Sequence, residues 1–84
     1  MTEILFFGRL RDVAGGASRR GDLPGWVRTV ADVCAWLSTD DPCLGAAIAA
    51  PDIRVAVDWR FCLSQSESVC GAREIAFLPP LSGG

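Results

Sequence analysis

EIAFLPPLSGG, residues 74–84, is the segment that reveals most about the structure of this chain. It begins as an alternating strand, in which Ile75 and Phe77 would point to one side and Ala76 and Leu78 to the other. Since both sides are apolar, both are expected to be covered. Such a strand is typical of the middle of a sheet.

An extended arm is predicted to follow this strand. Two prolines fix φ and hold the segment extended, and the segment is apolar, whereas disordered tails are usually polar and charged. The two final glycines could enter a channel too narrow for any residue with a Cβ. The arm consists of Pro79, Pro80, Leu81, Ser82, Gly83 and Gly84. We therefore predict a folded domain over residues 1–78 and an arm over residues 79–84; the alternative is a frayed tail.

The rest of the chain predicts short strands around helical segments. Residues 2–7 are rich in β-branched and aromatic side chains and predict a strand that ends at Gly8. A helical turn over residues 9–14 and a weak, polar strand over residues 18–23 follow. Residues 53–57 predict another strand, which continues more loosely over residues 59–63.

The clearest helix begins after Thr29, a good N-cap with Asp32 three residues later. Apolar residues follow at helical spacing and form one stripe, namely Val30, Val33, Cys34 and Leu37. The polar run over residues 38–41 is expected to break this helix. Asp41-Pro42 is typical of a new helix start, so a short helix is predicted over residues 43–50.

This order of elements predicts an α+β fold in which a small mixed sheet packs on one main helix. The first and last strands are apolar on both sides, so we expect them at the centre of the sheet. The arrangement is a β-grasp, the ubiquitin-like architecture. With 84 residues the chain has room for one domain, and its 50% apolar content is enough for a core.

The charge pattern argues against nucleic-acid binding. The chain has a net charge of −2, and its 8 basic residues are all arginines, with no lysine and no histidine. Only Arg19 and Arg20 are adjacent, so there is no basic stripe to contact phosphates. The apolar run over residues 4–7 is too short for a signal segment or a membrane span. We expect no membrane association and a cytoplasmic location.

The cysteines do not predict a metal site. The chain has 4 of them, at Cys34, Cys43, Cys62 and Cys70. They form no Cys-x-x-Cys pair and there is no histidine to complete a mixed zinc site. Disulfides would need an oxidising compartment. We expect free thiols that pack as small apolar residues.

Both ends of the sequence resemble one known family. The opening ILFFGRLRD (residues 4–12) and the closing EIAFLPPLSGG (residues 74–84) are similar to the small subunit of molybdopterin synthase, the sulfur carrier of the MoaD family. Ala56-Val57 followed by a polar residue also matches the middle strand of that family. The resemblance runs from end to end without long gaps, and it implies the same β-grasp fold.

The resemblance implies a recyclable sulfur donor, a subunit of a transferase with no catalytic activity of its own. In the family, an ATP-dependent, E1-like adenylyltransferase converts the C-terminal carboxylate, here that of Gly84, into an acyl-adenylate. A sulfur donor protein then supplies the sulfur that replaces AMP and leaves a thiocarboxylate. Two such sulfur transfers to cyclic pyranopterin monophosphate build the dithiolene of molybdopterin. No tightly bound cofactor is expected, and the lack of an evident nucleophile–base pair agrees with this role.

The resemblance also implies an interface with the large subunit of molybdopterin synthase, with which the family forms a heterotetramer. Phe7, Phe61 and Leu78 occupy the hydrophobic contact positions of the family. Strand alternation supports this for Phe7 and Leu78, because they lie opposite the core-facing Phe6 and Phe77. The arm would then insert into the large subunit. The alternative is that these residues belong to the ordinary core.

The sequence departs from the family pattern near two turns. Asp58 stands where the family often has Asn, Gly71-Ala72 stands where it usually has Asp-Gly, and Arg73 replaces an acidic residue. These differences affect turn geometry and local strand register, not the arm. Two other functions stay open. One is a sulfur carrier for thiamine, cysteine or tRNA thiolation, and the other is a non-catalytic ubiquitin-like interaction module. The run over residues 77–80 favours the molybdopterin pathway.

Overall fold

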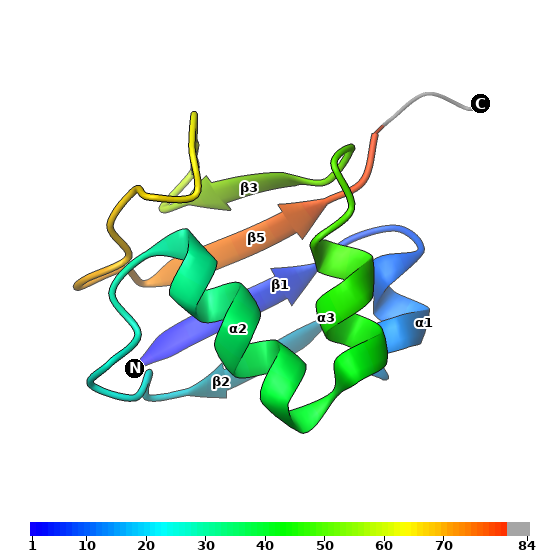
Figure 1. Ribbon diagram of the computed structural model, residues 1–84, viewed down its shortest axis with the longest axis horizontal. Coiled ribbons are helices and arrows are strands. Elements are labelled where there is room, and N and C mark those ends of the chain that lie inside the picture. The colour runs from blue at the N-terminus through cyan, green and yellow to red at the C-terminus, as the bar shows by residue number, and fades with distance from the viewer. Residues whose placement is uncertain (81–84) are drawn as a thin grey trace.

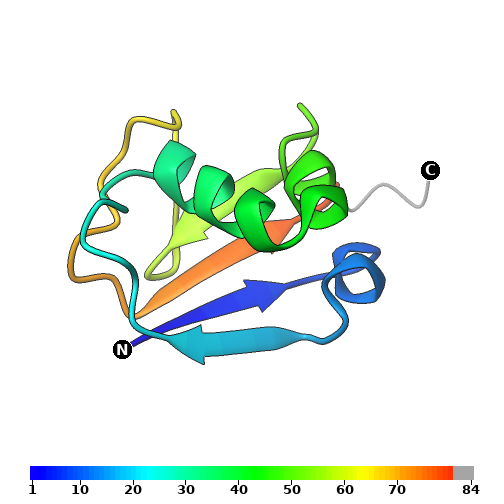
Figure 2. The same cartoon turned by 60° about the horizontal axis from the view of Figure 1, so that its bottom comes forward.

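The computed structural model describes residues 1–80 and shows a twisted sheet with helices packed on one side (Figures 1 and 2). Five strands form the sheet in the order β2-β1-β5-β3-β4. Their bounds are Thr2–Phe6 (β1), Ser18–Gly21 (β2), Arg54–Val57 (β3), Arg60–Phe61 (β4) and Glu74–Leu78 (β5). The helices are Leu10–Ala14 (α1), Val30–Asp40 (α2) and Pro42–Ile48 (α3). This confirms the predicted α+β β-grasp.

The two central strands run parallel, and the other neighbours are antiparallel. β5 is the middle strand, between β1 and β3. Ile4 pairs with Ile75 and Phe6 pairs with Phe77, so these side chains face the helices together. The Phe6 and Phe77 rings stack with centroids 6.0 Å apart. The expectation that the first and last strands form the centre is therefore confirmed.

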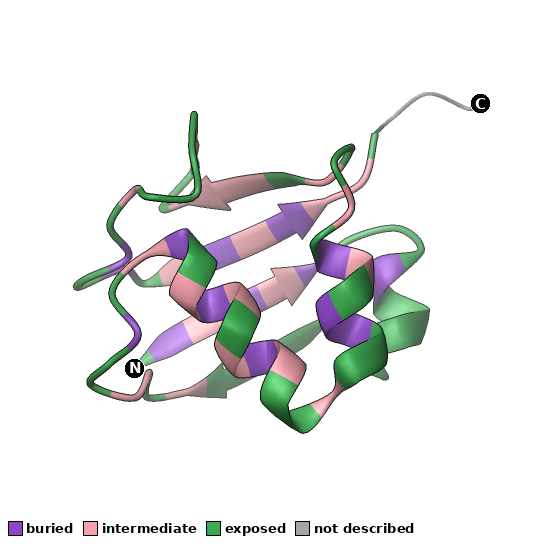
Figure 3. Ribbon diagram, viewed as in Figure 1, coloured by how far each residue is buried: buried purple, intermediate pink, exposed green. Residues whose placement is uncertain are grey.

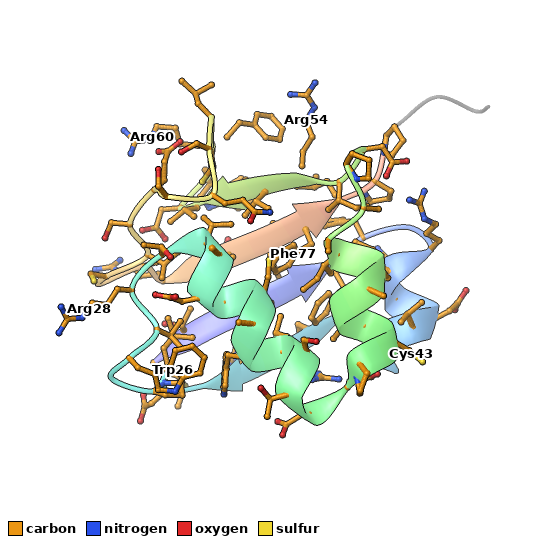
Figure 4. The ribbon with its side chains drawn as sticks, viewed as in Figure 1. Trp26, Arg28, Cys43, Arg54, Arg60 and Phe77 are labelled. Carbon is orange, nitrogen blue, oxygen red and sulfur yellow. The ribbon has the colours of Figure 1, made fainter. Side chains whose placement is uncertain are left out.

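The main core lies between the sheet and the helices (Figure 3). Ile75 and Phe77 are fully buried, and Figure 4 places Phe77 in this interior. From α2, Val33 and Leu37 are buried and Cys34 packs partly buried against them, as the apolar stripe predicts. Burial of each large side chain contributes about 1.5–3 kcal/mol.

Helix α2 begins where the sequence predicts and ends within the polar run that was expected to break it. The Thr29 hydroxyl accepts a hydrogen bond from the Asp32 N–H, and Asp32 in turn accepts from the Thr29 N–H, which completes a capping box. The predicted break over residues 38–41 falls at its last residue, Asp41, because α2 continues to Asp40 and α3 begins at Pro42. In the last turn, the Thr39 hydroxyl donates a hydrogen bond to the Ala35 carbonyl. Asp41 then caps α3 through the Leu44 N–H.

The two weaker strands are shorter than predicted. β2 stops at Gly21 instead of residue 23, before the Pro24-Gly25 turn. β4 covers only Arg60–Phe61, instead of residues 59–63, because Asp58 and Trp59 form the turn that joins it to β3. Both strands lie at an edge of the sheet, where each pairs with a single neighbour.

Substitution of Gly45 by Ala is expected to lower the free energy of unfolding by about 1–3 kcal/mol. Gly45 is buried in α3, and a Cβ added there would clash with the Ser38 side chain and lie 2.8 Å from the Ser38 Cα. Urea denaturation measures the loss. Gly16→Ala is the control, because a Cβ at Gly16 meets no atom within 4 Å. Equal stability of the two variants would show that α2 and α3 can move apart without cost.

Candidate functional site

The face of the sheet opposite the helices carries an apolar patch. Residues that pair directly across neighbouring strands share a face, and the register links Leu5 with Ala76, Ala76 with Ala56, and Ala56 with Phe61. Phe7 and Leu78 extend the same face of β1 and β5. We call this surface the open-face patch; it consists of Leu5, Phe7, Ala56, Phe61, Ala76 and Leu78.

Two adjoining hollows shape the open-face patch. The floor of the first includes Ala56 and Ala76, and its further lining is Leu5, Phe7, Trp59, Phe61, Glu74 and Leu78. The second lies at the start of the arm and is lined by Phe7, Gly8, Arg54, Phe61, Leu78, Pro79 and Pro80. Phe7, Phe61 and Leu78 line both hollows. The structure thus brings together the three residues that were predicted to contact a partner; the contact itself stays a prediction.

Exposure separates the predicted contact residues from the core. Phe7 is 37% exposed and Phe61 is 57% exposed, whereas Phe6 and Phe77 are at most 1% exposed. Leu78 is half-buried. The alternative that Phe7 and Phe61 are ordinary core residues does not fit these values. Both side chains are available on the surface of the isolated chain.

The start of the arm is held against the turn after β1. Gly8 has φ +57°, and a Cβ placed on it would lie 2.8 Å from Cγ of Pro79. Only glycine suits both the backbone conformation and this close approach. Nearby, Arg9 and Asp52 form an ion pair with an N–O distance of 3.2 Å. The sequence marked Gly8 only as a strand end, because its contact with Pro79 is long-range.

Of the predicted arm, the structure describes Pro79, which is half-buried, and Pro80, which is exposed. They leave the sheet at the end opposite to Met1 (Figure 1). Leu81, Ser82, Gly83 and Gly84 lie outside the described residues. The division into a domain over 1–78 and an arm over 79–84 therefore stays a prediction, as does the role of each arm residue.

Asp58 anchors the turn between β3 and β4 to the start of β5. Its Oδ1 accepts hydrogen bonds from the N–H groups of Arg73 at 2.8 Å and Glu74 at 3.0 Å. These bonds hold the pKa of the Asp58 carboxyl below its usual value. Asp58 thus makes the side-chain contact that an Asn oxygen could also make. Gly71 lies in the second turn at which the sequence differs from the family pattern, and it has φ +74°.

Within the described part of the chain, the cysteines belong to no group that could bind a metal ion. All four are free. Burial raises the pKa of the Cys34 and Cys62 thiols, which disfavours thiolate chemistry at those two positions. In residues 1–80 no group of three or more Cys, Asp or Glu side chains could hold a metal ion. Nor does this part contain a helix long and apolar enough to span a membrane.

The β-grasp, with β5 in the middle of its mixed sheet, places the chain in the class of ubiquitin-like proteins. The chain belongs to the ThiS family, which it matches over residues 4–84. It is accordingly a small sulfur carrier or ubiquitin-like modifier of the ThiS/MoaD type. Proteins of this type work with E1-like activating enzymes.

Solved structures agree with this assignment. SAMP1 from Haloferax volcanii is 28% identical, with a TM-score of 0.79, over 99% of this chain and 98% of that chain. A second H. volcanii structure, named small archaeal modifier protein 1, is 26% identical over 95% and 97%, with a TM-score of 0.75. A candidate molybdopterin converting factor, subunit 1, from Pyrococcus furiosus shares the fold at 19% identity, over 95% and 97%, with a TM-score of 0.69. A comparison with curated proteins gives no significant match.

Proposed function

We propose that this chain is the sulfur-carrying small subunit of molybdopterin synthase. The observation that carries the proposal is the placement of Pro79 and Pro80, which leave the central strand directly beside the open-face patch. A partner that covers this patch would receive the arm that follows. The similarity of residues 4–12 and 74–84 to the MoaD family favours the molybdopterin pathway over other carriers of the same fold.

The chemistry takes place at the carboxyl group of Gly84. A free carboxylate resists nucleophiles, so an E1-like adenylyltransferase first joins it to AMP and releases pyrophosphate from ATP. A donor protein then supplies sulfur at the oxidation level of sulfide, which displaces AMP from the acyl carbon and leaves a thiocarboxylate. In the large subunit, the terminal sulfur attacks cyclic pyranopterin monophosphate. Water then cleaves the bond between this sulfur and the acyl carbon of Gly84, which returns Gly84 to the carboxylate. The chain contributes the sulfur and its placement, without a general acid or base.

The arm limits the entropy lost on insertion. Pro79 and Pro80 restrict the backbone before binding, so less freedom is lost when the arm enters a channel. Gly83 and Gly84 would let the backbone pass where a Cβ would not fit. Gly8 supports the same function from outside the arm, because it lets Pro79 pack closely on the domain.

The test is the intact mass of the chain after incubation with ATP, the adenylyltransferase and a sulfur source. We expect a gain that matches exchange of one oxygen for one sulfur, located at Gly84. The loaded chain, mixed with the large subunit and the pterin precursor, should then yield molybdopterin. A chain that gains sulfur and fails in the second step would be a carrier of another pathway, such as thiamine, cysteine or tRNA thiolation. If the mass of the chain does not increase, while the same enzyme is active on a known carrier, the result would favour the ubiquitin-like interaction module.

Protein modification is a second candidate, because the chain resembles SAMP1, a small archaeal modifier protein. In that case the activated Gly84 carboxyl would form an amide with a lysine of another protein. The 84-residue chain itself contains no lysine, so it offers no side-chain amine for a second copy. Each acceptor lysine would carry one copy, and mass spectra of conjugates would show no lysine-linked chains of this protein.

A further inference from the structure

Trp59 occupies a backbone position that is unfavourable for its side chain. Asp58 and Trp59 form the two-residue turn between Val57 and Arg60, which pair across β3 and β4. Their φ values are +48° and +71°. Turns of this kind usually contain Asn-Gly or Asp-Gly. Asp58 fits the first position, but a bulky aromatic residue at the second is an outlier.

Burial of the indole does not explain this arrangement. Trp59 is 87% exposed, more than Trp26 at 53%. The turn is held instead by the Asp58 carboxylate, which accepts hydrogen bonds from two N–H groups at the start of β5. The fold therefore keeps Trp59 in a strained conformation without burying its side chain. Strain of this kind is found mainly at functional sites.

The Trp59 indole lies at the end of the open-face patch that is farther from the start of the arm. Trp59 lines the first hollow together with Ala56, Ala76 and Glu74. Along β5, the distance from Glu74 to Leu78, where the arm starts, is about 13 Å. Since the two hollows share Phe7, Phe61 and Leu78, one apolar surface runs from Trp59 to Pro79.

The charges around the patch also differ from end to end. Glu74 lines the hollow beside Trp59, and within residues 1–80 it forms no ion pair. The neighbouring Asp58 carboxylate is already engaged by two N–H groups and lies near Arg73, so Glu74 supplies the negative charge at this end. Arg54 lies at the other end, beside the start of the arm (Figure 4). A partner that fits this surface would offer an apolar pocket with a basic group on the side of Trp59.

We propose that Trp59 is an anchor residue for the adenylyltransferase that activates the Gly84 carboxyl. The proposal rests on the proposed function only in that the chain is activated, a step that carriers and modifiers share. An enzyme that receives the arm must hold the domain in a fixed orientation. A tryptophan at the far end of the surface supplies a second attachment point, and tryptophan is enriched among residues that dominate binding energy.

The test compares Trp59→Gly with the unchanged chain. Glycine relieves the positive φ, so the Tm should rise, while loss of the indole should weaken binding of the adenylyltransferase about tenfold or more. In ATP–pyrophosphate exchange, KM for the carrier should rise with kcat nearly unchanged, because the anchor is remote from the reacting carboxyl. A purely structural role of Trp59 would not give a gain in Tm together with a loss of affinity.

Trp26→Ala is the matched control. Trp26 is also exposed, but it lies on the edge of the molecule opposite to Arg60, the neighbour of Trp59 (Figure 4), and its removal should change affinity by less than about twofold. Trp59→Phe should recover part of the binding. The proposal is overturned if Trp59→Gly binds the adenylyltransferase as tightly as Trp26→Ala does. It is also overturned if the Tm of Trp59→Gly falls.

Self-association is a further outcome that would overturn the proposal. If Trp59→Gly alters only a monomer–dimer equilibrium in sedimentation, the occupant of the patch is a second copy of the chain. Failure of the molybdopterin function is recognised separately, because a carrier of another pathway would still need Trp59 for adenylation. The large subunit and its pterin substrate are not required for any of these measurements.

Discussion

Removal of Gly84 is expected to abolish adenylation, with a loss of at least about 100-fold in ATP–pyrophosphate exchange. Deletion withdraws the carboxyl group by one residue, about 3.3 Å, whereas misplacement of a reacting group by about 1 Å can already cost 100-fold. The Tm should stay unchanged, because the core that holds the domain together ends at Phe77. Thermal unfolding checks this on the same sample.

Gly84→Ala is the companion variant. It keeps the position of the carboxyl group and adds only a Cβ, so any loss of adenylation or sulfur transfer reports on the width of the channel. Near-normal turnover of this variant would contradict the narrow-channel argument. If the chain without Gly84 still binds its partner and functions, the Gly-Gly end is incidental and the protein is an interaction module.

Phe7→Asp is expected to weaken the proposed complex with the large subunit of molybdopterin synthase about 30-fold or more, which corresponds to about 2 kcal/mol. Phe7 lines both hollows of the open-face patch, so a carboxylate there would be buried without a partner in the complex. The Tm of the isolated chain should change little, because the side chain is already 37% exposed. Isothermal titration with the large subunit measures the affinity.

Val13→Asp is the matched control for this substitution. Val13 has the same 37% exposure and lies on α1, away from both hollows, so the same chemical change there should leave binding intact. Phe6→Ala gives the response of a core position, a loss of about 3–5 kcal/mol of stability. If Phe7→Asp unfolds the domain as Phe6→Ala does, Phe7 acts as a core residue and the predicted interface is wrong at this position.

The sequence predicted the elements whose signals are local. β5 has the predicted bounds, because its alternation is uninterrupted and Pro79 follows at once. The start of α2 was predicted because Thr29 and Asp32 form a capping box by themselves. The end of α2 was predicted only to within the polar run over residues 38–41, and the helix ends at Asp40, where Asp41 becomes the N-cap of α3.

Long-range contacts account for what the sequence could not show. Gly8 is required by a contact with Pro79, and Asp58 by its hydrogen bonds to Arg73 and Glu74. Neither partner is a neighbour in the sequence. The open-face patch was only partly predicted, because alternation identified Phe7 and Leu78, while Ala56 and Ala76 form the floor of a hollow only through strand register. Trp59 was missed because Asp-Trp carries no hairpin signal.

The central place of β5 links activation of the chain to completion of folding. β5 follows every other strand in the sequence, yet it fills the middle of the sheet between β1 and β3. Its pairing with β1 joins distant segments, such as Glu3 with Glu74, and such pairings form slowly. During synthesis, β1 and β3 must therefore wait for the last strand before they share one sheet. A newly made chain would present its arm beside an assembled patch only once folding is complete, so the adenylyltransferase would select mature carriers over unfinished ones.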